Sequence, residues 1–198
     1  MILKILVLCH TEGQRCNSTI TRIVEKEFFD AILLCGVSDY RKVLDLDRRV
    51  FGIPLLEDDI YIIRILKEKG SYIAGTWHQI ERSLCVGGID SRNPFQNAER
   101  LKHQKPSECK YAIILSSYMP KHSMCSKVRL LNKEVSIGFA PLSTLASEFQ
   151  RVLIISCTSN IEKEVCMESF NKNTLLIATK RSVIQVTVNM STLEVEVV

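Results

Sequence analysis

The sequence predicts an α/β protein with two layers of β-sheet and helices on the outside. Apolar runs end abruptly in small, polar or titratable residues, as buried parallel strands do where they deliver loops to the carboxyl edge of a sheet. Helical periodicity between the first runs gives a β-α-β-α-β order, which implies right-handed crossovers and a parallel sheet. The chain after residue 173 is rich in β-formers with turn-length connections, which predicts antiparallel strands that complete a second sheet. The five runs that end at this edge are 4–9, 31–35, 71–74, 111–115 and 151–155.

Four helices are predicted between these strands. The first begins at a cap, Asn17 or Ser18, and continues to Phe29. The second covers 55–69, and Gly70 ends it. The other two cover 96–103 and 142–149. The expected buried faces of the first two are Ile20, Ile23, Val24 and Phe28, and then Leu56, Ile60, Ile63 and Leu66.

The remaining segments are predicted from turn signals. A short strand at 83–86 should end at Gly87-Gly88, and 120–137 should be a long irregular segment. The tail should form strands at 174–178, 182–189 and 193–198. There is no repeat or composition shift, so residues 1–198 are expected to form a single domain.

Composition is that of an ordinary globular protein. The 198 residues are 46% hydrophobic and 24% charged, with a net charge of +4. The basic residues are spread along the chain, so nucleic-acid binding is not indicated. No apolar run approaches the roughly 20 residues of a membrane-spanning helix, and the N-terminus lacks a signal-peptide pattern. We therefore expect a cytoplasmic protein with no membrane contact.

The eight cysteines are scattered and form no C-x-x-C pair, so zinc-site spacing is absent. Cys9, Cys35, Cys85 and Cys157 end apolar strands, where cysteine usually behaves as a small buried apolar residue. Disulfides in a cytoplasmic protein would be expected only in a hyperthermophilic, archaeal source.

Seven blocks along the chain carry a family resemblance. They are ILVLCHTEG, FDAILLCGVSD, YIAGTWHQIE, VGGIDSRNPFQNAERL, AIILSSYMP, VLIISCTSN and NKNTLLIATKRS. In this order and spacing they resemble the motifs of the calcineurin-like metallophosphoesterase family, especially its small archaeal and bacterial members. The resemblance covers nearly the whole chain. It implies a four-layer αββα fold and a site where two divalent metals activate water for attack on a phosphoester.

The sequence departs from the family pattern at each ligand position. The bridging aspartate position holds Val37, which cannot coordinate a metal. Two dications about 3.5–4 Å apart repel each other and need a shared anion between them. The resemblance therefore implies no catalytic and no metal-ligating residue. The degenerate pocket is predicted to contain His10, Glu12, Val37, Asp39, Thr76, His78, Ser117, Cys157 and Ser159.

Three arrangements are open for the titratable members of this pocket, His10, Glu12, Asp39 and His78. They form a hydrogen-bonded or ion-paired cluster that replaces the lost metals, they hold one metal such as Mn, Zn or Fe, or they are loose, solvent-exposed side chains. Trp77 is either a surface anchor for a partner or packs beside the loop that precedes it.

The function predicted from the resemblance is a catalytically inactive metallophosphoesterase-fold protein that acts as a binding or scaffold module for an unknown protein partner. The family precedents are the retromer-type small subunit and the inactivated domains of polymerase B-subunits. The expected contact face is 118–120 with Trp77. One alternative is a divergent metal-dependent phosphodiesterase or phosphatase with a rebuilt, mononuclear site. Another is a nucleotide or phosphate sensor that uses backbone N–H groups of glycine-rich loops.

Overall fold

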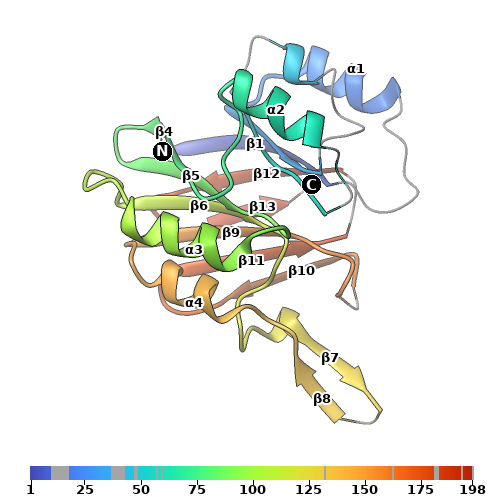
Figure 1. Cartoon of the computed structure of the whole chain (residues 1–198), viewed down its shortest axis with the longest axis vertical. Helices are drawn as coiled ribbons and strands as arrows, with labels where there is room; N and C mark the ends of the chain where they lie inside the picture. Colours follow the sequence, from blue (N-terminus) through green and yellow to red (C-terminus); the bar gives the residue numbers. More distant parts are fainter. Residues whose placement is uncertain are drawn as a thin grey trace.

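A computed structural model describes residues 1–9, 18–36, 43–46, 49–56, 58, 60–131, 133–161, 163–180, 183–192 and 194–197. The described chain is a mixed α/β structure with two large sheets, a small hairpin and few helices (Figure 1). The helices are α1 (Ser18–Lys26), α2 (Ile60–Glu68), α3 (Pro94–His103), α4 (Ala140–Ala146) and the 3-10 helix η2 (Met124–Ser126). The strands are β1 (Ile2–Cys9), β2 (Ala31–Cys35), β3 (Val50–Ile53), β4 (Trp77–Glu81), β5 (Leu84–Ile89), β6 (Tyr111–Ser116), β7 (Lys127–Leu130), β8 (Lys133–Ser136), β9 (Arg151–Cys157), β10 (Val165–Ser169), β11 (Thr174–Thr179), β12 (Val183–Asn189) and β13 (Glu194–Val197).

The first large sheet has five strands in the order β13-β12-β1-β2-β3. β1, β2 and β3 are parallel, as the β-α-β order predicts, and β12 and β13 add antiparallel to the β1 side. The second large sheet has six strands in the order β10-β11-β9-β6-β5-β4. Its four central strands are parallel, and the two edge strands are antiparallel to their neighbours.

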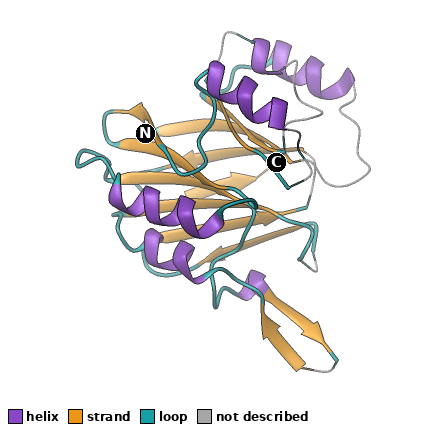
Figure 2. Ribbon diagram, viewed as in Figure 1, coloured by secondary structure: helices purple, strands orange, loops and turns teal. Residues whose placement is uncertain are grey.

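The two sheets share an apolar core. Alternate residues of β1 and β2, such as Ile5 and Leu33, cluster with Ile113 of β6 and Leu153 of β9. The intervening residues of β1 and β2 pack with Val24 of α1 and with α2. In the six-stranded sheet, the side chains on the other face pack with α3 and α4. Helices therefore cover a face of each large sheet, and the central strands are buried on both faces (Figure 2).

The tail was expected to form antiparallel strands that complete a second sheet, which holds for the pairing of β12 with β13 but is wrong for β11. β11 is parallel to β9 in the six-stranded sheet, whereas β12 pairs with β1 in the five-stranded sheet. Consecutive strands therefore belong to different sheets. The local pattern of β-formers does not distinguish these partners, because both sheets offer an equally apolar inner face.

Gly87 and Gly88 were expected to end a strand, but β5 continues through both to Ile89. A Cβ atom on Gly87 would lie 2.8 Å from the ring of Trp77, and one on Gly88 would lie 3.0 Å from Ile73. Each glycine therefore leaves space for a neighbour that packs directly on the backbone. β3, β4, β10 and the β7–β8 hairpin were also not predicted, and each is only four or five residues long.

The buried face of α2 differs from the expected one. Ile62, Ile65 and Leu66 are buried, whereas Ile60 and Leu56 are exposed. Six of the nine α2 residues are apolar or aromatic, so the sequence permits more than one helical face. In the first helix, Phe29 just after α1 is buried in place of Phe28.

The segment 71–74 was expected to be a strand and instead joins the two large sheets. Tyr72 forms a bridge with Gly52 of β3, and Ala74 forms a bridge with Gly88 of β5. A Cβ atom on Gly88 would also collide with the side chain of Ile53 and lie 3.2 Å from the Ile73 carbonyl oxygen.

Gly88→Ala is therefore expected to lower the free energy of unfolding by about 1–3 kcal/mol, the usual cost of overpacking a core. Urea unfolding followed by circular dichroism measures this loss. The control is Gly70→Ala, where no atom lies within 4 Å of the new Cβ and the cost comes from the backbone φ of +65° alone. Equal losses for the two variants would contradict the packing explanation.

No helix in the described part of the chain is long and apolar enough to cross a bilayer.

Candidate functional site at the carboxyl edge of the sheets

Part of the predicted degenerate pocket lies outside the described residues. These members are His10, Glu12, Val37 and Asp39, and the predicted cap Asn17 lies outside as well. The structure describes the other five members: Thr76, His78, Ser117, Cys157 and Ser159.

Cys157 forms a disulfide with Cys9, and their Cα atoms are 5.8 Å apart. Cys9 is the last residue of β1 and Cys157 is the last residue of β9. The carboxyl ends of strands from the two large sheets therefore meet, as the sequence predicted, and a covalent bond joins them. Both cysteines are buried in the shared core.

Two further disulfides join Cys85 to Cys109 and Cys125 to Cys166. The interpretation of the strand-end cysteines as unpaired apolar residues is therefore wrong for Cys9, Cys85 and Cys157. It holds for Cys35, which is a buried free thiol. A cysteine that packs as an apolar side chain and one that pairs across a core have the same local sequence context, so only the tertiary contacts distinguish them.

Ser117 lies near Cys35, at the place where the ends of β2 and β6 come together. Burial raises the pKa of the Cys35 thiol, the Ser117 hydroxyl opposes this effect, and the negative charge of Asp58 adds to it. The Ser117 Oγ atom is buried and makes no hydrogen bond of normal geometry to a described residue. Its backbone N–H donates to the Ile89 carbonyl oxygen at 3.2 Å. The ends of β2 and β6 therefore contain two weakly polar, buried groups.

Thr76 and His78 do not belong to this group. The His78 Nε2 atom lies 3.2 Å from the Tyr72 carbonyl oxygen, and the Thr76 hydroxyl donates to the same oxygen at 3.2 Å. The His78 ring packs against Phe51, with ring centroids 5.6 Å apart. In the β4–β5 pairing His78 lies opposite Val86, three residues before Ile89, which places it about 10 Å along the strand from the end of β5. Ser159 is exposed.

Trp77 is half-buried and packs against the apolar cluster of the six-stranded sheet. Its Nε1 atom donates a hydrogen bond to the Leu101 carbonyl oxygen at 2.7 Å. Its ring packs edge-on against the Phe149 ring, with 5.1 Å between the ring centroids. Met119 and Pro120 are buried, so the contact face expected around 118–120 is largely covered.

The most developed polar group at this edge was not predicted. Asp90 follows β5 directly and is only 1% exposed. Its Oδ1 atom accepts hydrogen bonds from the backbone N–H groups of Arg92 (3.1 Å) and Asn93 (3.0 Å) and from the Asn97 side-chain amide (2.7 Å). Asp90 therefore organises the turn into α3 by satisfying backbone donors that the helix start leaves unpaired.

Arg92 ties this turn to the loop before α2. Its guanidinium donates to the carbonyl oxygens of Leu55 (3.2 Å), Leu56 (3.1 Å) and Asp58. The buried Asp58 carboxylate accepts the Leu55 backbone N–H at 2.8 Å. Arg92 therefore joins a loop of one large sheet to a loop of the other, and its guanidinium N–H groups donate hydrogen bonds to backbone carbonyl oxygens. The sequence signal was an Asp that directly follows an apolar strand, in the stretch Gly-Gly-Ile-Asp.

Burial and the Asp90 carboxylate raise the pKa values of two tyrosines, Tyr72 and Tyr118. Burial first, and then the Asp90 charge, raise the pKa of Tyr72, while Arg100 and Arg92 partly offset the shift. Burial and the same carboxylate raise the pKa of Tyr118. A raised pKa in the folded state stabilises the protein below the ordinary tyrosine value of 10.0, and this stabilisation is lost as the pH rises through the folded-state pKa.

We therefore expect stability to fall above pH 10.0, and Asp90→Asn to bring the Tyr72 and Tyr118 pKa values closer to normal. An ultraviolet titration of tyrosinate follows all five tyrosines, and the curves of the Tyr72→Phe and Tyr118→Phe variants assign the two raised pKa values. Glu99→Gln, an exposed change on α3, is the control. Titration curves that are identical for wild type and Asp90→Asn would contradict the assigned influence of Asp90.

The described donor set is poorly suited to a divalent metal. A cysteine coordinates as a thiolate, and Cys9 and Cys157 are bonded to each other. Across the described ranges, no group of three or more His, Cys, Asp or Glu side chains could hold a metal ion. The edge instead contains hydrogen-bonded carboxylates, a buried thiol and a disulfide.

Comparison with known proteins identifies a fold relationship only. No family model and no curated protein matches the sequence. One solved structure matches with a TM-score of 0.67 at 11% sequence identity, and the match covers 100% of this chain and 99% of the other. That likeness shows a shared fold. A single mutant of Vps29 from Entamoeba histolytica, a metallophosphoesterase-fold protein, matches with a TM-score of 0.36 at 10% identity and covers 99% of this chain and 98% of its own. This second likeness is too weak to support an argument.

Proposed function

We propose that this chain is a single-domain protein with the four-layer metallophosphoesterase-like fold, that it does not catalyse phosphoester hydrolysis, and that it acts as a binding or scaffold module. The observation that carries the proposal is the Cys9–Cys157 disulfide. This bond joins the ends of β1 and β9. In the family that the sequence resembles, the loops after these two strands carry metal ligands.

The chemistry of the neighbouring positions supports the same function. Ser117, at the position of a family histidine, is a neutral hydroxyl buried beside the Cys35 thiol. His78 directs Nε2 at a backbone carbonyl oxygen. A rebuilt site with one metal would need His78 to join His10, Glu12 and Asp39, which lie outside the described residues, and the contacts of His78 do not favour this alternative.

Two measurements test this proposal. The first is elemental analysis of the protein after incubation with Mn²⁺, Zn²⁺ or Fe²⁺ and desalting, and the second is an assay of hydrolysis of p-nitrophenyl phosphate and bis-p-nitrophenyl phosphate. We expect far less than one metal ion per chain and no turnover. One tightly held metal per chain, with turnover that His10→Ala abolishes, would show that the chain is an enzyme. His103→Ala, a change at an exposed histidine in the last turn of α3, is the control.

We further propose a cytoplasmic location in an organism that maintains disulfides in intracellular proteins, as hyperthermophilic archaea do. The three disulfides support this choice over an ordinary reducing cytoplasm. Thiol alkylation in a fresh lysate of the source organism, followed by mass spectrometry, tests it. Full alkylation of Cys125 and Cys166 would contradict it.

A further inference from the structure

The β7–β8 hairpin projects away from the two large sheets (Figure 1). Val128 pairs with Val135 and Arg129 pairs with Glu134, and among the described residues neither strand pairs with a third. Leu131 at the turn is 99% exposed. A two-stranded hairpin alone in water is only marginally stable, so a further strand or surface is expected to complete it.

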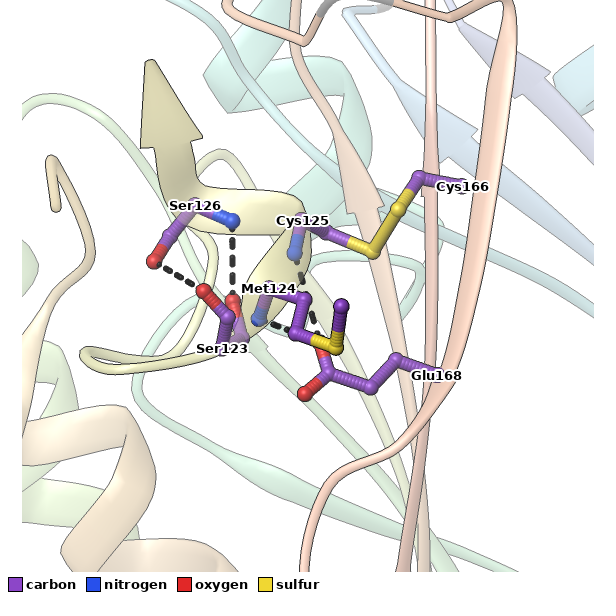
Figure 3. The surroundings of a disulfide bond; sticks show 6 residues. All are labelled: Ser123, Met124, Cys125, Ser126, Cys166 and Glu168. Atoms are coloured by element: carbon purple, nitrogen blue, oxygen red, sulfur yellow. Dashed lines mark hydrogen bonds between the residues drawn. A yellow bond between two sulfur atoms is a disulfide. The ribbon is translucent and has the colours of Figure 1, made fainter. Parts of the chain in front are cut away.

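The base of the hairpin is fixed to the edge strand β10. A disulfide joins Cys125 of η2 to Cys166 of β10, with 5.8 Å between the Cα atoms. The Glu168 carboxylate of the same strand accepts the backbone N–H groups of Met124 (2.7 Å) and Cys125 (3.3 Å) (Figure 3). These contacts hold η2 in a defined position on β10.

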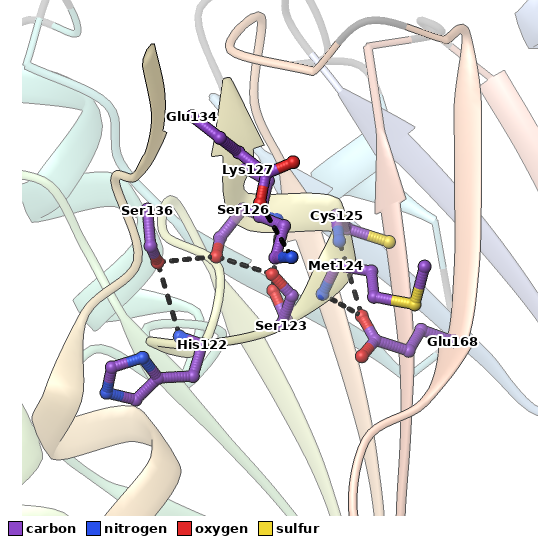
Figure 4. Close-up of polar contacts among 9 residues, drawn as sticks. All are labelled: His122, Ser123, Met124, Cys125, Ser126, Lys127, Glu134, Ser136 and Glu168. Carbon is purple, nitrogen blue, oxygen red and sulfur yellow. Dashed lines mark hydrogen bonds and ion pairs between the residues drawn. The ribbon is translucent and has the colours of Figure 1, made fainter. Parts of the chain in front are cut away.

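Hydrogen bonds continue into the hairpin itself. The Ser126 and Ser136 hydroxyls are 2.9 Å apart, and Ser136 Oγ accepts the His122 backbone N–H at 3.2 Å. Lys127 Nζ lies 2.7 Å from Glu134 Oε1 across the two strands (Figure 4). The hairpin is therefore presented in a fixed orientation, which lowers the entropy cost of binding along its edge.

β7 has one basic and one apolar face. Lys127 and Arg129 alternate with Val128, so they point to the opposite side of the strand. The stretch 121–137 contains no Phe, Tyr or Trp, the side chains on which single-stranded nucleic acids stack. An alternating basic and apolar strand without aromatic residues favours a protein strand as its partner.

The same chain contains a complementary strand. β13, with the sequence Glu-Val-Glu-Val, is an edge of the five-stranded sheet and pairs within the described chain only with β12. Glu194 and Glu196 are exposed, and Val195 and Val197 pack against the shared core. An exposed edge presents unpaired backbone donors and acceptors to another strand.

We propose that β7 of one copy of this chain adds to the free edge of β13 of a second copy. The strands are equal in length, and with Val128 opposite Val195, Lys127 and Arg129 lie opposite glutamates whether the strands run parallel or antiparallel. A slip of one residue would place the charges against valines, so the pattern also sets the register. This inference rests on the proposed binding function and identifies its partner.

The test is self-association of the purified chain, measured by sedimentation velocity over a range of concentrations. We expect association that weakens at high salt, as exposed charge pairs do. Arg129→Glu and Glu196→Arg should each weaken association roughly tenfold, because each places like charges opposite each other. For parallel strands, combining Arg129→Glu with Glu196→Arg should restore most of the association, because these two residues then face each other. For antiparallel strands, combining Arg129→Glu with Glu194→Arg should restore it instead, and failure of both combinations would contradict the pairing. Arg82→Glu, an exposed arginine in the β4–β5 turn, is the control.

Thermal unfolding checks that the variants are folded, and amide hydrogen exchange gives an independent measurement. β7 and β13 should gain protection as the concentration of wild type rises, while β4, also an edge strand, should not. A monomer at all concentrations, or association unaffected by both substitutions, would overturn this inference. Neither result bears on metal content or turnover, so the proposed function is judged separately.

Discussion

Replacing Cys9 and Cys157 together by alanine is expected to lower the free energy of unfolding by about 5 kcal/mol. The bond closes a loop with a sequence separation of 148 residues, and the entropy that a disulfide removes from the unfolded chain grows with the length of that loop. A loss of this size is comparable with the total stability of many domains. The bond also joins the two large sheets at the candidate site, so its loss should destabilise both sheets.

The matched control is the Cys85→Ala, Cys109→Ala double variant. This pair is also buried, but its separation is only 24 residues, so the expected loss is about 3.5 kcal/mol. Denaturant unfolding under non-reducing conditions measures both losses. The order of the two losses is the decisive result, because both variants remove the same atoms from a buried position. A larger loss for the shorter loop would contradict the entropic explanation.

Thiol counting on the denatured, non-reduced protein checks the bonds directly. Alkylation should reach Cys35 and no cysteine of the three disulfides. Modification of Cys9 in this experiment would show that the sheets are not joined covalently, and the observation that carries the proposed function would be lost.

Asp90→Ala is expected to be the most damaging change at a single position outside the disulfides, with a loss of about 3–5 kcal/mol. The substitution leaves two backbone N–H groups and the Asn97 amide without their acceptor inside the protein. It also removes the group that fixes the start of α3. Chemical denaturation measures the loss.

Asp90→Asn retains an acceptor oxygen and should cost less than Asp90→Ala, because only the charge is removed. Glu99→Ala, which removes an exposed carboxylate from α3, should change stability by less than about 0.5 kcal/mol. A small effect of Asp90→Ala would mean that the turn finds other acceptors, and Asp90 would then not organise this edge.

The sequence determined the strands that are buried on both faces, because their composition leaves few alternatives. β1, β2, β6 and β9 lie within one or two residues of their predicted bounds, and Gly70 ends α2 with the expected positive φ. The convergence of strand ends at one edge also followed from the sequence, since parallel strands with helical crossovers must place their carboxyl ends together. The Cys9–Cys157 contact agrees with this expectation.

Only the tertiary structure decided which partners the shorter elements take. β10 and the β7–β8 hairpin have too few residues for a clear period, and β11 and β12 could each have joined either sheet. The pairing of six cysteines and the hydrogen bonds from Arg92 to the loop before α2 depend on residues far apart in the chain, such as Cys9 and Cys157. A residue's type and its neighbours set its local conformation, but hydrogen bonds and disulfides between distant segments form only when the packing of the sheets brings their atoms within a few ångströms.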